Sequence, residues 1–254
     1  DAHTYRVGVL REVSGRGGSA YVHDELRAGD LVGIGGPRNN FPMVPAQRYL
    51  FVAGGIGITP LLPMLYQADL LGVEWQLLYG GRHRASMAFL DELAGYGDRV
   101  HAMPWDEFGL LDLAGFLGAP DQHTRVYCCG PAPLLAAIEA ACTGWSARAL
   151  RTERFVAAGQ TASARDVPFQ VELVRSGATL TVDPGISVLD AAHAAGVDVL
   201  SSCRQGTCGT CETTVLAGAP DHRDSILNDD ERAAGDCMFI CVSRALDDRL
   251  VLDL

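Results

Sequence analysis

The chain has 254 residues, of which 48% are hydrophobic and 20% are charged, so it holds enough apolar material for two or three packed domains. Its net charge of -11, without any run of Lys and Arg, argues against a nucleic-acid partner and would instead suit a basic protein partner. No apolar stretch is long enough to cross a bilayer, and residues 1–10 lack a signal-peptide pattern. We therefore expect a soluble, cytoplasmic protein with no membrane attachment, and a monomer.

The first 46 residues predict short strands separated by turns. Strands are expected over Thr4 to Arg11 and Asp30 to Ile34, with the glycine-rich SGRGGS between them at 14–19. These segments are too few to close a barrel. Because the strand pattern begins almost at once after Asp1, we interpret the sequence as a fragment of a longer protein.

From about residue 47, apolar runs alternate with helical stretches, as in successive βαβ units around a parallel sheet. Strands are expected near 48–53, 74–79, 99–103, 124–129 and 147–155. Helices are expected near 59–71, 86–95 and 131–142. This pattern predicts a doubly wound sheet of the kind that binds nucleotides.

A domain boundary is expected in the small, uncharged stretch 157–164, which suits a flexible connection between separately folded units. Beyond it we expect two strands and a turn, then a helix that starts after the N-cap Ser187 and stops at Gly196. The two strands are Phe169 to Arg175 and Thr179 to Val182, and the turn is Asp183-Pro184-Gly185.

Three of the eight cysteines crowd into the segment SSCRQGTCGTC at 201–211. Cys203, Cys208 and Cys211 are spaced C-x4-C-x2-C, and Cys241 follows further along the chain. This is the ligand order of a plant-type 2Fe-2S cluster, which needs four thiolates from one tight loop and one distant strand. The spacing therefore predicts an iron-sulfur site at these four residues.

Two glycines in this segment, Gly206 and Gly209, would let backbone N–H groups approach the sulfides of such a cluster. Zinc is the alternative metal, although its thiolate ligands usually come as two close pairs. Cys237 is an alternative ligand, but it does not complete the plant-type order, and we expect a buried thiol there. Cys142, near the end of a predicted helix, is also expected in a core.

Two turns at strand ends are candidates for nucleotide binding. The run Arg48 to Ala53 leads directly into GGIGITP at 54–60, where glycines would bring backbone amides close to a pyrophosphate. A turn of this kind can equally be purely structural. Cys129, in CCGP at 128–131, also follows a strand and would face the crevice at the carboxyl edge of the sheet, unless it is simply a buried small residue.

These motifs resemble those of the phthalate dioxygenase reductase family over essentially the whole chain. The matching segments are GRGGS at 15–19, GPRNNFP at 36–42, GGIGITP at 54–60, CCGP at 128–131, SSCRQGTCGTC at 201–211 and CVSR at 241–244. The resemblance implies an α/β plus α+β fold. Its parts are a partial flavin-binding β-barrel at 1–46, a NAD(P)H-binding domain at 47–157, a linker at 158–167 and a β-grasp ferredoxin domain at 168–254. The family's Arg-x-Tyr-Ser segment would precede Asp1, so the barrel is expected without its N-terminal part.

Carried over residue by residue, the resemblance implies a flavin site and a nicotinamide nucleotide site. The expected FMN contacts are Gly8, Val9, Leu10 and Thr59 and, at the phosphate, Gly17, Gly18 and Ser19. Gly17-Gly18 has the alternative of a simple hairpin turn. The expected nucleotide contacts are Gly55, Gly57, Thr59, Gly130 and Cys129, the last assigned as catalytic.

Two further sets of residues follow from the same resemblance. Glu153 or Phe155 would close over the flavin ring. Arg82 and Arg84, with Ser86, follow the second strand of the sheet, where positive charge would favour the phosphate of NADPH over NADH. Arginines at such a place are alternatively just solvated surface.

The family implies that a hydride passes from NADH or NADPH to FMN, and that single electrons then pass through the 2Fe-2S cluster to a terminal oxygenase. Flavin is required because a cluster cannot accept a hydride. The oxygenase would be of the Rieske or haem-thiolate type, either separate or fused upstream. The alternative is a non-catalytic ferredoxin-type carrier with a degenerate nucleotide-binding domain.

Acidic residues gather late in the chain and could steer a basic partner, or could simply begin a solvated helix. They are Asp221, Asp224, Asp229, Asp230 and Glu231. We expect His193 and His222 to be surface or core residues, not metal ligands.

Overall fold

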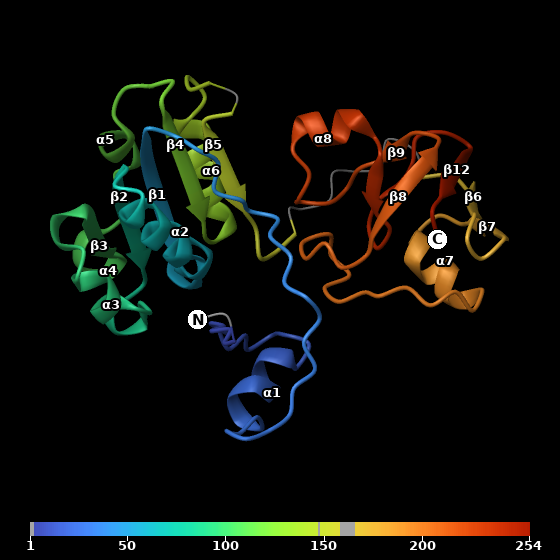
Figure 1. The fold of residues 1–254 in the computed structure, drawn as a ribbon, viewed down its shortest axis with the longest axis horizontal. Coiled ribbons are helices and arrows are strands. Elements are labelled where there is room, and N and C mark those ends of the chain that lie inside the picture. Colours follow the sequence, from blue (N-terminus) through green and yellow to red (C-terminus); the bar gives the residue numbers. More distant parts are fainter. Residues whose placement is uncertain (1–2, 147, 158–165) are drawn as a thin grey trace. The chain divides into compact units, whose positions relative to one another are not determined.

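The computed structural model describes residues 3–146, 148–157 and 166–254. The chain forms two compact units, Asp1–Glu153 and Arg154–Leu254 (Figure 1). Each unit has its own sheet and its own hydrophobic core. The predicted linker at 158–167 lies mostly outside the described residues, so the domain boundaries stay a prediction.

A five-stranded parallel sheet forms the centre of the first unit. Its strands lie in the order β3-β2-β1-β4-β5, and every neighbouring pair is parallel. The order reverses beside β1, which is where ligands bind in doubly wound sheets. The five predicted strands are confirmed as β1 Arg48–Gly54, β2 Glu74–Gly81, β3 Val100–Pro104, β4 Thr124–Cys129 and β5 Leu150–Glu153.

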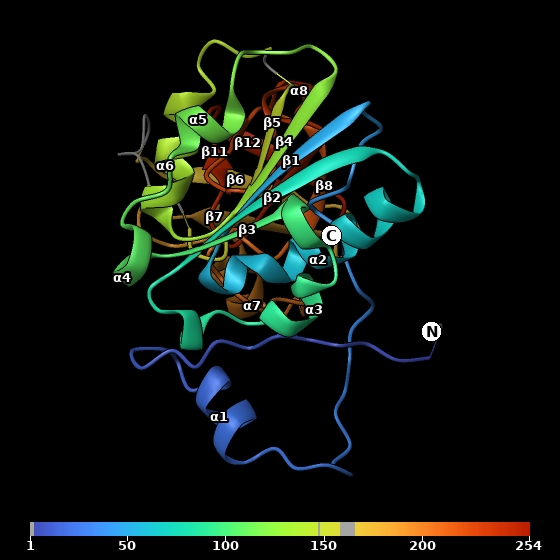
Figure 2. The same cartoon turned by 90° about the vertical axis from the view of Figure 1, so that its left-hand side faces the viewer.

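Helices cover both faces of this sheet (Figure 2). Phe51 of β1 packs in a core with Leu61 of α2, whereas the next residue, Val52, belongs to the opposite core with Ile138 of α6. This alternation follows from the period of two in a strand. The helical elements of the unit around the sheet are η1 Gly55–Gly57, α2 Ile58–Leu70, η2 Arg84–Ser86, α3 Leu90–Ala94, η3 Gly97–Arg99, α4 Trp105–Phe108, α5 Leu113–Leu117 and α6 Ala132–Ala141.

The helices expected over 59–71 and 131–142 are confirmed by α2 and α6. The single helix expected over 86–95 is wrong in its first half, because η2 ends at Ser86 and α3 starts at Leu90. Phe89 lies between them with a φ of 64°, a left-handed conformation that a right-handed helix does not include.

Residues 3–46 contain no strand in the part of the chain that the structure describes. The strands expected over 4–11 and 30–34 are therefore wrong. A strand must exchange hydrogen bonds with a neighbour, and no neighbouring strand is described beside either segment. The hairpin alternative for Gly17 is also wrong, because this residue, with a φ of 98°, is the N-cap of a helix, α1 Gly18–Asp24.

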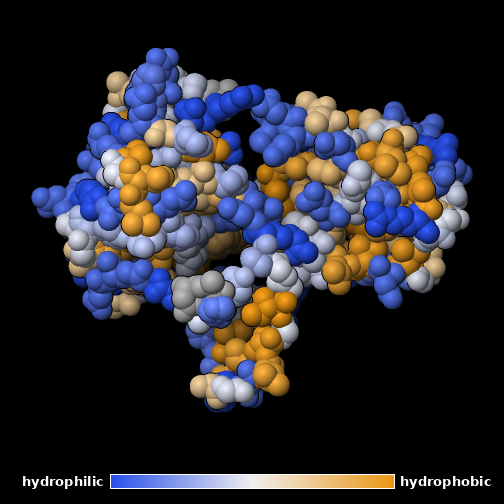
Figure 3. Space-filling model, in the orientation of Figure 1, coloured by the Kyte–Doolittle hydropathy of each residue, from blue (hydrophilic) through white to orange (hydrophobic). Residues whose placement is uncertain are grey.

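The same segment leaves many apolar side chains exposed. Figure 3 shows them gathered around α1. The exposed members are Tyr5, Val7, Leu10, Val13, Tyr21, Val22, Leu31, Val32 and Ile34. The predicted alternation of apolar residues is thus present, but it does not produce a buried strand face in this segment.

The second unit is built on a mixed five-stranded sheet in the order β10-β8-β12-β6-β7. The central strand β12 runs parallel to β6 and antiparallel to β8, with α7 packed beside the sheet, which is the β-grasp arrangement expected for this region. Its elements are β6 Phe169–Leu173, β7 Ala178–Val182, α7 Val188–Ala194, β8 Glu212–Ala217, β9 Pro220–Asp221, α8 Asp229–Ala234, β10 Cys237–Phe239, β11 Arg244–Ala245 and β12 Arg249–Leu252.

Local capping fixes both helices of this unit, at α7 through the N-cap that the sequence predicts. The Ser187 hydroxyl accepts a hydrogen bond from the Asp190 amide at the start of α7, and Gly196 adopts a φ of 78° just beyond its end. At the start of α8, Asn228 and Glu231 exchange hydrogen bonds between side chain and backbone in a capping box. The acidic run 229–231 is therefore a helix start.

Candidate functional site

The four cysteines of the predicted cluster site all lie in the second unit. Cys203, Cys208 and Cys211 occupy the loop between α7 and β8, and Cys241 follows β10. The backbone amides of Gln205 and Thr207 point at the Cys203 sulfur, at N–S distances of 3.3 and 3.4 Å. The loop thus presents amide donors to a sulfur, as iron-sulfur sites require.

The pKa values of the sulfurs depend on one another, most directly within two pairs, Cys203 with Cys208 and Cys211 with Cys241. Burial would raise the pKa of Cys203, but hydrogen bonds from Thr207, Gln205 and Cys208 lower it to about 6. The pKa of Cys211 is lowered chiefly by a hydrogen bond from the Cys241 thiol, whose own pKa the same bond raises. Two sulfur pairs suit a centre with two irons, because each iron takes two thiolates.

Within residues 3–146, 148–157 and 166–254, no three or more His, Cys, Asp and Glu side chains surround one position for a metal ion. A zinc site would bring all four thiolates around a single position, whereas a 2Fe-2S cluster divides them between two irons. The order of three cysteines in one loop and one further along the chain is that of the cluster rather than of two close zinc pairs.

The backbone of the cluster loop depends on positive φ angles. Gly206 has a φ of 68° and Gly209 a φ of 74°, and a Cβ on Gly206 would lie 2.7 Å from a methyl group of Val242. Arg204 also takes a positive φ, of 56°, and its guanidinium pairs with Asp190 of α7 at 2.9 Å. The loop is thus fixed to the helix that precedes it.

The two remaining predicted thiols behave differently. Cys237 is half-buried on β10, and burial, followed by the charges of Glu212 and Asp236, raises its pKa to about 11. Cys237 lies outside the plant-type ligand order of the other four cysteines. Cys142 is buried in the core of the first unit, as predicted.

In the first unit, the predicted glycine turn joins β1 to α2 at the carboxyl edge of the sheet. A Cβ on Gly57 would lie only 2.2 Å from the carbonyl oxygen of Cys129, and one on Gly130 would lie 3.0 Å from the Cα of Gly54. The turns after β1 and β4 therefore pack backbone against backbone. Gly55 differs: its φ is 55°, and no other described atom would lie within 4 Å of a Cβ there.

Cys129 is buried, with 1% of its surface exposed, as the alternative of a buried small residue predicts. Its Sγ lies 4.0 Å from Oε2 of Glu153, because the two residues are register partners on β4 and β5. Burial, and next the Glu153 charge, raise the pKa of Cys129, while burial raises that of Glu153 to about 7. The role of Cys129 in catalysis stays a prediction.

The structure brings some of the predicted flavin residues together. A Cβ on Gly8 would lie 2.7 Å from the methyl group of Thr59, so these two predicted contacts are neighbours. Gly17 and Ser19 lie at the N-terminal end of α1, where the Ser19 hydroxyl accepts a hydrogen bond from the Glu12 amide at 3.0 Å. Phe155 falls in the other unit and is 48% exposed.

The arginines after β2 meet an acidic helix that the sequence analysis did not single out. The guanidinium of Arg84 forms two hydrogen bonds to Glu107 of α4, at 3.1 and 2.9 Å, and His83 lies 2.9 Å from Asp106. The Arg82 carbonyl accepts a hydrogen bond from the Asp106 amide. Acidic residues just after β3, the strand beside β2, were the available clue to this contact.

Of the acidic residues proposed to steer a partner, Asp224 is buried, with 6% of its surface exposed, and therefore cannot belong to an exposed acidic surface. Asp221 is mostly covered and pairs with Arg223 at 2.7 Å. His222 is also largely covered, as a core residue would be.

Known proteins are similar in sequence to both units of this chain. A family model described as the 2Fe-2S iron-sulfur cluster binding domain matches residues 171–246. The phenoxybenzoate dioxygenase subunit beta of Ectopseudomonas oleovorans is 48% identical over 256 residues, which cover 100% of this chain and 80% of that protein. The carnitine monooxygenase reductase subunit of Escherichia coli (strain K12) is 40% identical, with the same two coverages.

Two solved structures extend the comparison. An intact type IV self-sufficient cytochrome P450 monooxygenase matches with a TM-score of 0.87 and 43% identity, over 97% of this chain and 32% of that one. Phthalate dioxygenase reductase, a modular structure for electron transfer from pyridine nucleotides to [2Fe-2S], matches with a TM-score of 0.63 and 37% identity, over 97% of this chain and 78% of that one.

A doubly wound sheet and a β-grasp unit with a 2Fe-2S binding domain, joined in one chain, define an oxidoreductase of the flavin and iron-sulfur type. The identity to relatives over the whole chain is specific enough to name the group. The chain belongs to the phthalate dioxygenase reductase family. None of the helices in the described residues is long and apolar enough to cross a membrane.

Proposed function

We propose that the chain takes a hydride from NADH or NADPH onto FMN and passes single electrons through a 2Fe-2S cluster to a terminal oxygenase. The observation that carries this proposal is the plant-type order of cysteines, within the segment that matches a 2Fe-2S binding domain, in the same chain as a doubly wound parallel sheet. Relatives whose names describe dioxygenase and monooxygenase subunits support an oxygenase as the electron acceptor.

Cys203, Cys208, Cys211 and Cys241 would hold the cluster. When bound, the cluster supplies a one-electron carrier. The protein's part is to supply hydrogen bonds to the sulfurs, as the amides of Gln205 and Thr207 do at Cys203. Cys237, which is half-buried and does not complete the plant-type order, is not part of the proposed set.

The nucleotide would bind over the carboxyl edge of β1 and β4. Gly55, Gly57 and Thr59 lie on the turn after β1, and Cys129 and Gly130 end β4, so both sets reach the point where the strand order reverses. The close packing of Gly57 against the backbone of Cys129 would hold the turn after β1 in place. The backbone at Gly55 has no described atom near it and could contact the nucleotide. Glu153, with a pKa near 7, can hold or release a proton at this edge.

FMN would contact Gly8, Val9, Leu10 and Thr59, with its phosphate near Gly17, Gly18 and Ser19. The contact between Gly8 and Thr59 supports the first group. The position of Gly17, Gly18 and Ser19 at the start of α1, which no described side chain caps, supports the second, because helix starts attract anions. Glu153 or Phe155 would cover the flavin ring. Arg82 and Arg84 would lie near the nucleotide's ribose, where Glu107 offsets the charge of Arg84.

The proposal also keeps the domain scheme of 1–46, 47–157, 158–167 and 168–254. A cytoplasmic location belongs to the same proposal, because its free thiols and its nucleotide cofactor suit a reducing compartment. The oxygenase would be of the Rieske or haem-thiolate type. A match to the cytochrome P450 chain, of which this chain covers 32%, supports the haem-thiolate option.

A visible spectrum of the purified full chain, reconstituted with FMN, iron and sulfide, tests the function. We expect flavin and iron-sulfur bands together, and bleaching of both by NADH or NADPH. The alternative, a non-catalytic ferredoxin-type carrier, predicts iron-sulfur bands that neither nucleotide bleaches but dithionite does. A chain without iron-sulfur bands under these conditions would contradict both.

A further inference from the structure

Asp224 is a buried carboxylate between β9 and α8. Its side chain is 0% exposed, and Oδ1 accepts hydrogen bonds from the amides of Ile226 and Leu227 at 2.9 and 2.8 Å. Oδ2 has no hydrogen-bond donor within the part of the chain that the structure describes. Burying a carboxylate oxygen without a donor is unfavourable, so the charge at this place needs an explanation.

The segment around Asp224 contacts both parts of the proposed ligand set. The amide of Ser225 donates to the carbonyl oxygen of Gly206 at 2.9 Å, within the cluster loop. The amide of Arg223 donates to the hydroxyl of Ser243 at 3.2 Å, in the segment that carries the fourth cysteine. A Cβ on Gly206 would come within 2.9 Å of the Asp224 Cα, so the contact is close.

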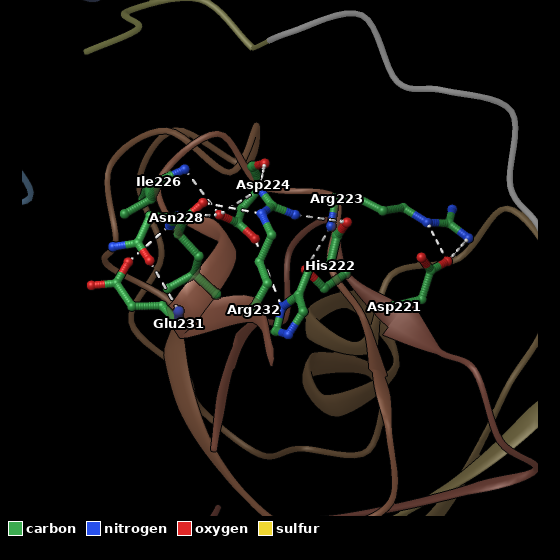
Figure 4. Close-up of polar contacts among 10 residues, drawn as sticks. Asp221, His222, Arg223, Asp224, Ile226, Asn228, Glu231 and Arg232 are labelled. Carbon is green, nitrogen blue, oxygen red and sulfur yellow. Dashed lines mark hydrogen bonds and ion pairs between the residues drawn. The ribbon is translucent and has the colours of Figure 1, made fainter. Parts of the chain in front are cut away.

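Arg232 of α8 completes this arrangement (Figure 4). Its Nη2 lies 3.5 Å from Oδ1 of Asp224 and donates to the Asp224 carbonyl oxygen at 2.6 Å. The same guanidinium donates to the carbonyl oxygens of His222 and Leu227 at 3.1 and 3.0 Å. One cation therefore holds the backbone of residues 222–227 and faces the buried carboxylate.

His222 does not neutralise Asp224. Its Nδ1 lies 3.9 Å from Oδ2, beyond hydrogen-bond distance, and neither ring nitrogen has a hydrogen-bond partner among the described residues. Burial lowers the pKa of His222, although Asp224 opposes this, which favours the neutral ring at pH 7. The counter-charge that contacts Asp224 is thus Arg232.

We propose that Asp224 and Arg232 are positioning residues that hold the cluster loop and, through their opposite charges, set the reduction potential of the 2Fe-2S cluster. The inference rests on the proposed function. Reduction adds one electron from the flavin to the cluster, and hence one negative charge. A buried carboxylate nearby makes this step less favourable, and a nearby guanidinium makes it more favourable.

The experiment measures the reduction potential of the full chain by spectroelectrochemical titration, together with its visible and electron paramagnetic resonance spectra. Asp224→Asn keeps an oxygen that can accept the Ile226 and Leu227 hydrogen bonds but removes the charge. We expect a more positive potential with the cluster spectra retained. Asp229→Asn, which removes an exposed charge at the start of the adjacent helix, is the matched control and should leave the potential unchanged.

Arg232→Gln should shift the potential in the opposite direction, to a more negative value, and Arg232→Lys, which keeps the charge, should restore it. If Asp224→Asn loses the cluster, the two Arg232 variants decide the question. Equal potentials in Asp224→Asn and Asp229→Asn, or in Arg232→Gln and the unchanged chain, would overturn the inference. Absence of a cluster in the unchanged chain would instead contradict the proposed function.

Discussion

The cluster loop at 203–211 and the carboxyl edge of the parallel sheet are both rich in cysteine and glycine, but they use these residues differently. In the loop, hydrogen bonds lower the pKa of Cys203 to about 6, and positive φ angles bring amides to its sulfur. At the sheet edge, burial and the Glu153 charge raise the pKa of Cys129, and Gly57 serves close packing.

This difference shows that residue type alone does not determine the chemistry of a thiol. Hydrogen-bond donors around a sulfur favour the thiolate, whereas burial next to a carboxylate favours the thiol. The loop is therefore suited to metal ligation. The sheet edge is suited to positioning a cofactor and holding a proton.

The largest expected effect tests the loop. Cys208→Ser should abolish the iron-sulfur absorption, because a hydroxyl does not replace the thiolate in one of the two sulfur pairs. Cys237→Ser, on β10 of the same unit, is the control and should retain the spectrum. Retention in the first variant and loss in the second would show that the ligand set is wrong.

The next largest effect tests the packing of the sheet edge. Gly57→Ala should destabilise the first unit by about 1–3 kcal/mol, because the added Cβ meets the backbone of Cys129 at 2.2 Å. It should also weaken nucleotide binding. Thermal unfolding measures the first effect, with Gly144→Ala as control, since its Cβ would meet no described atom closer than 3.9 Å. Equal stability of both variants would contradict close packing.

A pH effect tests the buried carboxyl group. The folded pKa of Glu153, about 7, lies above its ordinary value of 4.5, so the folded unit holds this proton more tightly than the unfolded chain does. Stability from Glu153 is therefore present below about pH 4.5 and lost as the pH rises to 7. The loss should be roughly 2 kcal/mol once partial exposure is allowed for.

Glu153→Gln should remove this loss, so its stability relative to the unchanged chain should improve between pH 5 and pH 8, as measured by urea unfolding at each pH. Glu107→Gln, at an exposed position on α4, serves as the control and should show no such change. A pH-independent difference would mean that Glu153 is not protonated in the folded unit.

The smallest expected effect concerns the choice of nucleotide beside the same edge. Glu107→Gln releases Arg84 from its ion pair, and the kcat/KM for NADPH should rise by about 1.4- to 5-fold, since exposed pairs contribute about 0.2–1 kcal/mol. The kcat/KM for NADH should not change, because NADH lacks the phosphate that Arg84 would contact. Asp98→Asn, another exposed acidic position in this unit, should alter neither, and a parallel change for both nucleotides would argue against a role in discrimination.

Sequence patterns predicted the parallel sheet and the capped helix α7, because these depend on local periodicity and caps, whereas the β-grasp unit was implied by the family resemblance. They failed over 4–11 and 30–34, where a strand depends on a neighbour that the described residues do not supply. The set of four cysteine ligands stays a prediction from their spacing, although the loop that carries three of them presents amide donors to Cys203.

The pairings that connect distant segments could not be predicted in the same way. The sequence suggests that Asp224 belongs to an acidic surface. The residues next to it in the chain give no sign that the cluster loop covers it. The ion pair between Glu107 and Arg84 was not predicted, because Arg84 follows β2 whereas Glu107 follows β3. The burial of Cys129 likewise depends on packing between two turns.

The hydrogen bond from Ser225 to Gly206 has a consequence for protein engineering. A chimaera that transplants only 203–211 and Cys241 into another β-grasp scaffold would carry the ligands without the segment that supports them. The transferable unit is larger and includes the stretch from β9 to the end of α8. Swapping electron-transfer modules between reductases would then succeed or fail according to a loop that contains no ligand.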